Sequence, residues 1–147
     1  MDYQEYIVND IHTVIAATTD KKGLPVTCAI DIMDCDDDGL YFLTAKGKGF
    51  YDRLTRNKYV SFTGVKGEDT MNMTAVSVRG KVTETGSKRL PRLFEKNPYM
   101  AEIYPTEDSR KALSVFCIYD GEGEWFDLSK KPIERRSFTI GCGKVTD

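Results

Sequence analysis

Short segments in which apolar and polar residues alternate, each bounded by turn-forming residues, constrain the fold of this chain more than any other feature. In "VTCAIDIMD", Val26, Cys28 and Ile30 fall on one side of an extended backbone, while Thr27 and Ala29 fall on the other. A period of two residues is typical of a half-buried strand. The acidic turn "DCDDDG" follows, and we expect "LYFLT" to return as the second strand of a hairpin.

The same alternation recurs along most of the chain. A β-branched run over residues 14–19 ends in the turn "DKKGLP" and is predicted to be the first strand. "YVSFTGV" and "TAVSVRGKVTET" predict two more strands. "LSVFCIYDGEGEWFDL" is interpreted as a hairpin around "DGEG", and "SFTIG" is predicted to be a last short strand.

Three segments depart from this period and predict helices. Tyr3, Ile7 and Ile11 are spaced four apart, which indicates a short helix over residues 3–12 with one apolar stripe. A second helix with Phe50 and Leu54 as apolar positions follows the loop "TAKGKG". "SKRLPRLFEKNPYMAEIYP" predicts a helix interrupted by prolines.

This arrangement predicts a mainly β fold, an antiparallel six-stranded barrel with a few flanking short helices. A closed or partly open barrel is favoured because closure is how a small sheet removes its unpaired edges. The chain has 147 residues, of which 40% are hydrophobic, and this suits one domain over residues 1–147.

Composition excludes several classes of function. A net charge of -2 argues against a nucleic-acid-binding protein, which needs a large cationic surface to displace counterions. No apolar run approaches the roughly 20 residues that span a bilayer, and no basic flank precedes an apolar core at the N-terminus. We therefore expect a cytoplasmic protein with no membrane partner.

Metal and histidine-based sites have little support. Cys28, Cys35, Cys117 and Cys142 show no C-x-x-C spacing, and His12 is the single histidine. Cys28 and Cys117 lie in predicted strands and are interpreted as small buried apolar residues. A regulatory or metal role for Cys142 stays open, and we interpret His12 first as a helix-end residue and second as a ligand contact.

The acidic turn has three aspartates at alternate positions, Asp34, Asp36 and Asp38. This spacing is found in calcium loops, but the glycine and the terminal glutamate of such loops are not at the required positions. The turn is therefore interpreted as solvated.

The loop between the strand "LYFLT" and the following helix can hold an anion. Thr44 ends the strand, and Lys46, Gly47, Lys48 and Gly49 lead into the helix. Backbone N–H groups at a helix N-terminus lack intrahelical acceptors and carry partial positive charge, and glycines let the backbone approach a ligand closely. A phosphate site and an ordinary solvated turn both remain open from this loop alone.

The order "GLPVTCAIDIMDCDDDGLYFLTAKGKGFYDRLTRNKYVSFTG" followed by "VSVRGKVTE" resembles the flavin-binding split barrel of the pyridoxamine 5'-phosphate oxidase family. The most specific part is the pairing of "G-x-P-V" with "DG-L-Y-F-x-T" and a basic loop before "L-x-x-N". The resemblance implies a six-stranded antiparallel barrel, a homodimer, and FMN in a groove at the dimer interface.

The resemblance also implies site residues. Thr44, Lys46 and Lys48 match the positions that hold the cofactor phosphate, and the strand over residues 25–30 matches the one beside the isoalloxazine ring. That strand lacks the Arg and Lys of the oxidase, and Phe50 replaces a helix-opening lysine, so Lys46 and Lys48 would supply the missing charge. The expected cofactor contacts are Thr44, Lys46, Lys48, Val26, Thr27, Cys28, Leu43, Tyr51 and Trp125, although a lone tryptophan also suits a core or an interface.

Several arginines have two interpretations. Arg79 is either a solvated residue on the outside of the barrel or part of a groove at the dimer interface. Arg135 and Arg136 are either exposed or close to a substrate anion.

The expected function is that of an FMN-dependent oxidoreductase. The flavin carries the redox chemistry, so no catalytic acid or base is required in the sequence. NAD(P)H is an expected electron donor and a small molecule the expected substrate. The alternatives are a non-catalytic flavin-binding or electron-transfer module, and a relative that binds a deazaflavin or haem. Haem is opposed by the single histidine, although cysteine and tyrosine stay open as ligands.

Overall fold

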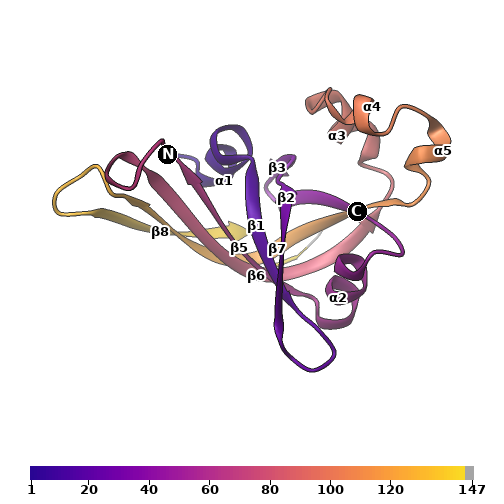
Figure 1. Ribbon diagram of the computed structural model, residues 1–147, viewed down its shortest axis with the longest axis horizontal. Coiled ribbons are helices and arrows are strands. Elements are labelled where there is room, and N and C mark those ends of the chain that lie inside the picture. The colour runs from indigo at the N-terminus through magenta and orange to yellow at the C-terminus, as the bar shows by residue number, and fades with distance from the viewer. Residues whose placement is uncertain (145–147) are drawn as a thin grey trace.

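The computed structural model describes residues 1–144 and contains one antiparallel sheet with eight strands in that part of the chain (Figure 1). The strands are β1 (Thr13–Thr19), β2 (Pro25–Asp31), β3 (Asp34–Asp36), β4 (Gly39–Ala45), β5 (Tyr59–Lys66), β6 (Thr74–Gly86), β7 (Leu113–Asp127) and β8 (Glu134–Gly141). Their order is β2-β1-β5-β6-β7-β4-β3, and β8 pairs with β7 outside this path. The mainly β split-barrel prediction is confirmed, with more strands than the six expected.

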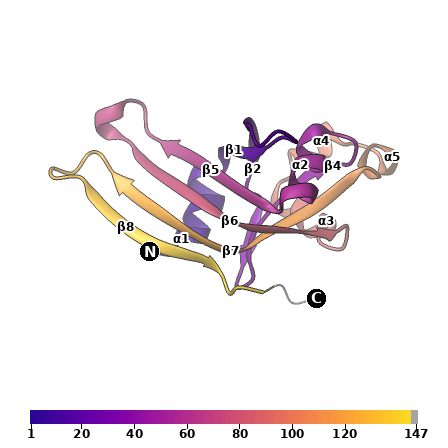
Figure 2. The same cartoon turned by 90° about the horizontal axis from the view of Figure 1, so that it is seen from below.

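Strand β7 belongs to two parts of the sheet. Residues 113–118 pair with β4, and residues 120–127 pair with β8. β6 runs beside both halves, and its register with β7 shifts between Lys81 and Val82. Such irregularities bend and twist a sheet, and Figures 1 and 2 show β6 and β7 running along most of the molecule.

The predicted hairpin around "DGEG" is wrong, because these residues lie inside the continuous strand β7. Gly121 faces Gly80 across the β6–β7 pair, and a Cβ at Gly121 would lie 2.8 Å from the carbonyl oxygen of Arg79. A Cβ at Gly123 would lie 2.5 Å from the Phe138 ring. These glycines therefore allow close approach within the sheet and do not form a turn.

The expected hairpin between "VTCAIDIMD" and "LYFLT" is also wrong. β2 pairs with β1 along its length, whereas β4 pairs with the short β3 and with β7. The chain changes direction where Ile32 N–H donates to the His12 carbonyl and Met33 N–H donates to the Tyr41 carbonyl. β2 and β4 thus lie near each other without pairing, which is the opening of the split barrel.

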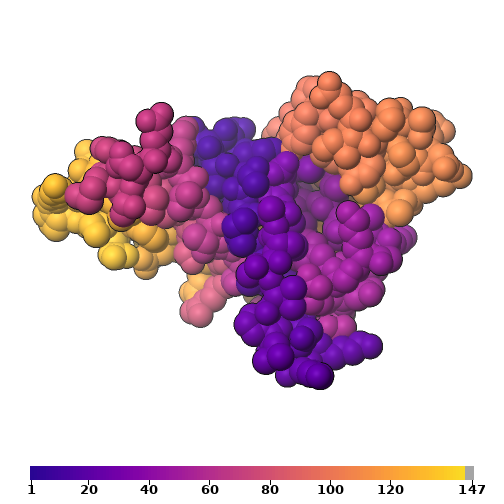
Figure 3. Space-filling model, in the orientation of Figure 1, coloured from indigo at the N-terminus to yellow at the C-terminus, as the bar shows by residue number. Residues whose placement is uncertain are grey.

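Helices flank the sheet. The N-terminal helix is α1 (Tyr3–Tyr6), which continues as the π-helix η1 (Ile7–Ile11), and α2 (Gly49–Asn57) follows β4. A 3-10 turn, η2 (Thr70–Asn72), precedes β6. The proline-interrupted segment forms α3 (Leu90–Lys96), α4 (Met100–Ile103) and α5 (Glu107–Arg110), which gather in one lobe in Figures 1 and 3. Within residues 1–144, none of these helices has the length and apolar character needed to cross a membrane.

Two apolar clusters fill the two faces of the sheet, because successive side chains on a strand point to opposite faces. The larger cluster lies under α1, η1 and α2 and contains Ile7, Val14, Phe42, Phe50, Leu54, Val78 and Phe116 among others. The smaller lies under α3 and α4 and contains Met33, Tyr41, Leu93, Met100, Val115 and Cys117. Cys117 is fully buried and Cys28 half-buried, as expected for small apolar residues.

The interpretation of the acidic turn as solvated is wrong for Asp34. Its side chain is fully buried and accepts hydrogen bonds from Arg89, Arg92 and Lys96. Burial disfavours the charged carboxylate, but the hydrogen bonds from Lys96 and Arg92 outweigh this effect and lower the pKa of Asp34. Asp34 therefore joins β3 to α3 through an ion-pair cluster that no local pattern in the sequence indicates.

A series of hydrogen bonds joins the helical lobe formed by α3, α4 and α5 to the end of η1 and the end of β2. Nε2 of His12 lies 2.7 Å from the Tyr99 hydroxyl, which donates to a carboxylate oxygen of Asp31 at 2.7 Å. Burial and the Asp31 carboxylate raise the pKa of Tyr99, so the phenol keeps its proton and remains a donor. His12 thus lies at the helix end, as predicted, and contacts the lobe.

Replacing Tyr99 with Phe is expected to lower the free energy of unfolding by about 1–2 kcal/mol, because it removes the hydroxyl that bridges His12 and Asp31. Both partners are partly exposed and can regain water, which limits the loss. Urea unfolding followed by fluorescence measures it. The control is Tyr104→Phe in the same lobe, since the Tyr104 hydroxyl makes no hydrogen bond to the described residues. Equal effects of both changes would contradict the role of Tyr99.

Candidate functional site

The start of helix α2 has free hydrogen-bond donors. The residue before it, Lys48, has an extended backbone and provides no side-chain cap. The N–H groups of Gly49, Phe50 and Tyr51 have no acceptor among residues 1–144, whereas Asp52 N–H already donates to the Lys48 carbonyl. Three aligned donors with the positive end of the helix dipole make an anion site.

Gly47 gives the loop its shape. Its φ of +90° lies in the region that side chains with a Cβ disfavour, so this position requires glycine. Lys46 and Lys48 on either side of it are exposed, and neither makes an ion pair with any described residue. Both cations are therefore available to a ligand at the start of α2.

Thr44 adds a hydroxyl to the same place. The residue is only 8% exposed, and its side chain has no hydrogen-bond partner in the described part of the chain. Because strand residues two apart share a face, Thr44 lies on the same face of β4 as Phe42, whose ring is 5.9 Å from that of Phe50 in α2. The Thr44 hydroxyl thus faces the side of the sheet that α2 covers.

A further cation at this place, Arg53, was not identified from the sequence. Its Nε donates to the Thr18 hydroxyl at 2.8 Å, which joins α2 to β1. Arg56 and Asn57 of the same helix also contact β1, through the carbonyl and hydroxyl oxygens of Thr19. The signal that could have indicated Arg53 is its position four residues after Gly49, which places both on one side of the helix.

Strand β2 lies next to this cluster. Val26 pairs with Thr18, the residue that holds Arg53, and both Val26 and Cys28 are half-buried. Burial raises the pKa of the Cys28 thiol, and the nearby positive charge of Arg53 partly offsets this. Thr27 points to the opposite, exposed face. The structure therefore brings Val26 and Cys28 to the same opening as Thr44, Lys46 and Lys48.

Leu43 and Tyr51 have other surroundings. Leu43 faces the smaller apolar cluster under α3 and α4, opposite to Thr44 on the same strand. The Tyr51 hydroxyl donates to both carboxylate oxygens of Glu84, at 2.9 and 2.8 Å, and this carboxylate raises the pKa of Tyr51. Tyr51 contributes its backbone N–H to the start of α2, while its side chain is tied to β6.

Trp125 lies far from these residues within one chain. Thr44 pairs with Ser114 near the start of β7, and Trp125 lies eleven residues further along that strand, up to roughly 36 Å away. Its ring packs near Tyr3 of α1, at 6.3 Å between centroids, and its buried indole N–H has no partner in the described structure. A role for Trp125 at the cofactor would require a second chain.

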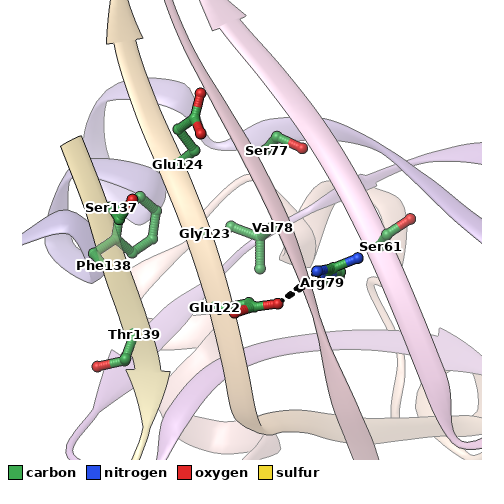
Figure 4. A pocket seen from close by; sticks show the side chains of 10 residues that line it. All are labelled: Ser61, Ser77, Val78, Arg79, Glu122, Gly123, Glu124, Ser137, Phe138 and Thr139. Atoms are coloured by element: carbon green, nitrogen blue, oxygen red, sulfur yellow. Dashed lines mark hydrogen bonds and ion pairs between the residues drawn. The ribbon is translucent and has the colours of Figure 1, made fainter. Parts of the chain in front are cut away.

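A shallow groove of about 660 Å³ runs over β5 to β8 (Figure 4). Arg79 lines this groove and is largely exposed, with Nη2 2.8 Å from a Glu122 carboxylate oxygen. Arg79 is thus on the outside of the barrel and lines a groove there. Arg135 and Arg136 are exposed and paired with Glu124 and Glu134.

A comparison with curated proteins finds no match to this chain. Solved structures give its fold. A NimC/NimA family protein from Clostridium acetobutylicum is 16% identical with a TM-score of 0.75, and the alignment covers 95% of this chain and 92% of that one. PhzG from Burkholderia lata, solved with tetrahydrophenazine-1-carboxylic acid, is 13% identical with a TM-score of 0.67, covering 92% and 84%. The haem storage protein HutZ from Vibrio cholerae is 12% identical with a TM-score of 0.64, covering 95% of each chain.

The family follows from a separate comparison. The sequence profile described as "Pyridoxamine 5'-phosphate oxidase" matches residues 2–119, which include β1 to β6, α2 and the loop with Lys46 and Lys48. The proteins of similar fold are described by different ligands, so the fold leaves the ligand of this chain open. The chain belongs to the pyridoxamine 5'-phosphate oxidase family.

Proposed function

We propose that this protein binds FMN at the opening between β2 and β4 and acts as an oxidoreductase. The observation that carries the proposal is the convergence of three unpaired backbone N–H groups, two unpaired lysines and the unpaired hydroxyl of the largely buried Thr44 at the start of α2. A phosphate monoester is a small dianion with several acceptor oxygens, so it matches this set of donors.

The residues present fit the cofactor. Lys46, Lys48 and Thr44, with the backbone of Gly49, would hold the phosphate, and Val26 and Cys28 at the edge of β2 would lie beside the ring. Bound FMN would supply hydride and electron transfer, for which NAD(P)H is a suitable donor. The chain would orient the ring and exclude water from it, which requires no acid or base beside the ring.

The absorbance spectrum of purified protein, with and without added FMN, tests this proposal. We expect a bound-flavin spectrum, bleaching by dithionite, and a higher melting temperature with FMN, since a ligand that binds the native state stabilises it. No change in either measurement would overturn FMN binding. Flavin bound but reduced by NAD(P)H no faster than free FMN would instead favour the non-catalytic module.

The same spectra test the ligands of other proteins with this fold. Haem would give an intense Soret band, but the single histidine is poorly placed as an axial ligand. Its Nδ1 lies 3.0 Å from the Val8 carbonyl and its Nε2 contacts Tyr99, so both ring nitrogens are occupied. A deazaflavin coenzyme would compete with FMN for the phosphate site and can be added as a rival ligand. The cytoplasmic location stays a prediction.

We also propose that the protein is a homodimer that covers the cofactor from a second side. Ile15 on β1 and Tyr59 and Val65 on β5 are each about half exposed on the outward face of the sheet. Exposed apolar residues gathered on one face are typical of an interface. A second copy placed there would lie near the opening beside β2.

Replacing Ile15 with Glu is expected to convert the dimer to a monomer and to lower FMN affinity at least roughly tenfold, because a charge would be buried at the interface. Light scattering gives the mass, which is predicted to be twice 16.6 kDa for the unaltered protein. Ile103→Glu is the control, since Ile103 is equally exposed on α4 in the helical lobe. A monomeric parent protein that binds FMN tightly would contradict the two-chain site.

A further inference from the structure

The helix that follows the basic loop has a glycine and an arginine one turn apart, Gly49 and Arg53. Gly49 has an ordinary negative φ, so its backbone does not require glycine. A Cβ built on Gly49 would lie 2.9 Å from Nη1 of Arg53. The missing side chain therefore leaves space that the guanidinium occupies.

The direction of the arginine follows from helix geometry. Side chains on a helix lean toward its N-terminus, so a residue covers the turn before it. Arg53 leans over Gly49, and the bond from its Nε to the Thr18 hydroxyl fixes the plane of the guanidinium. Thr18 is itself only 4% exposed, so the arginine is anchored to a buried residue.

Only one of the N–H donors of the Arg53 guanidinium has an acceptor in the described structure. An arginine carries five N–H donors, and the described structure assigns only the Nε bond to Thr18, besides a ring contact at 6.0 Å to Phe50. No carboxylate pairs with Arg53, and the acidic residue of this turn, Asp52, is exposed. The two terminal nitrogens thus remain available at the start of α2, beside the unpaired N–H groups.

We propose that Arg53, held in place by Thr18 and by the space at Gly49, makes this site selective for a terminal phosphate. This inference rests on the proposed binding of FMN and adds to it a residue outside the basic loop. The strand over residues 25–30 has no arginine or lysine, so the charge at the opening comes from α2 and its loop. A guanidinium binds two phosphate oxygens at once, whereas a lysine acts as a point charge.

The experiment compares the affinities for FMN and for riboflavin, which has the same ring without the phosphate. Arg53→Ala is expected to lower the ratio of FMN to riboflavin affinity roughly 10- to 100-fold, with riboflavin binding changed by less than about twofold. Arg53→Lys is expected to restore only part of the FMN-to-riboflavin ratio, because lysine keeps the positive charge but lacks the planar pair of N–H groups that can bind two phosphate oxygens. The matched control is Arg56→Ala, since Arg56 also joins α2 to β1 and lies near the other end of the helix.

Gly49→Ala separates a binding role from a structural one. Alanine favours a helix over glycine, so this variant is expected to melt at the same or a higher temperature. It is nevertheless expected to lower the FMN-to-riboflavin ratio, because the added methyl group displaces the guanidinium. In the Arg53→Ala background the same change should have little further effect, since the displaced group is absent.

The outcomes distinguish the two proposals. If the unaltered protein binds no FMN, the proposed function fails together with this inference. If it binds FMN and the Lys46 and Lys48 variants lose the preference for phosphate while Arg53→Ala keeps it within about twofold, only the role of Arg53 is overturned. A Gly49→Ala effect that persists undiminished without Arg53 would also overturn it.

Discussion

Replacing Asp34 with Asn is expected to lower the free energy of unfolding by about 3 kcal/mol, which corresponds to a fall in Tm of about 9 °C for a chain of this size. The Asp34 carboxylate is fully buried and accepts hydrogen bonds at 2.7 Å from Arg92 and Lys96 and at 3.1 Å from Arg89. Asn keeps the shape but removes the charge that balances these cations. The expected loss lies at the low end of values for buried ion pairs, because all three cations are partly exposed and can be hydrated.

The stability difference between the parent protein and this variant depends on pH through the pKa of Asp34 in the parent. Its hydrogen bonds lower the folded-state pKa below the unfolded value of about 3.9. In this case the unfolded state binds the proton more readily, so the stabilisation is complete above the unfolded pKa and disappears as pH falls through the folded one. The stability difference between the parent and Asp34→Asn should therefore be constant near neutral pH and shrink below about pH 4.

Urea unfolding at several pH values measures both effects. Asp37→Asn is the matched control, because Asp37 lies in the same turn, is exposed and makes no hydrogen bond or ion pair through its side chain with the described residues. It should leave stability nearly unchanged. An Asp34→Asn protein as stable as this control would show that the cluster does not hold the helical lobe to β3.

The double replacement of Lys46 and Lys48 by Ala is expected to weaken FMN binding roughly 100-fold, since each lysine would contribute one charge-assisted hydrogen bond to the phosphate. Both side chains are exposed and unpaired in the described structure, so the change should cost little stability. Riboflavin has no phosphate, and its affinity should change by less than about threefold. Fluorescence quenching of each flavin gives both affinities.

The control for this variant must carry the same change in net charge. Lys130 and Lys131 are both exposed in the turn between β7 and β8, outside the site. Their replacement by Ala should leave FMN binding unaltered at moderate salt, where exposed charges separated by more than about 10 Å are screened. Equal losses for FMN and riboflavin in the Lys46 and Lys48 variant would remove their assignment to the phosphate.

The local elements of the fold could be predicted because their signals are local. Alternation with a period of two identified most of the strands, since one face of each strand is buried and the other is not. The loop from Thr44 to Gly49 also gave a local signal, because a helix start exposes its N–H groups whatever packs around it, but a phosphate site was favoured over a solvated turn only by the resemblance to the family. Predictions failed where a local pattern had two structural meanings, as at Gly121 and Gly123, where glycine serves a turn or a close strand contact equally well.

By itself, then, the sequence determined most of the strands and the basic loop at the start of α2, and its resemblance to a known family indicated the split-barrel class. The tertiary structure alone decided that β7 continues through "DGEG", that Asp34 is buried among three cations, and that Arg53 reaches Thr18. Each of these depends on groups that lie far apart in the chain, such as Asp34 and Lys96 or Thr18 and Arg53. Whether a charged side chain is solvated or paired is decided by what the fold brings beside it, because burial without a partner would cost more free energy than the fold can supply.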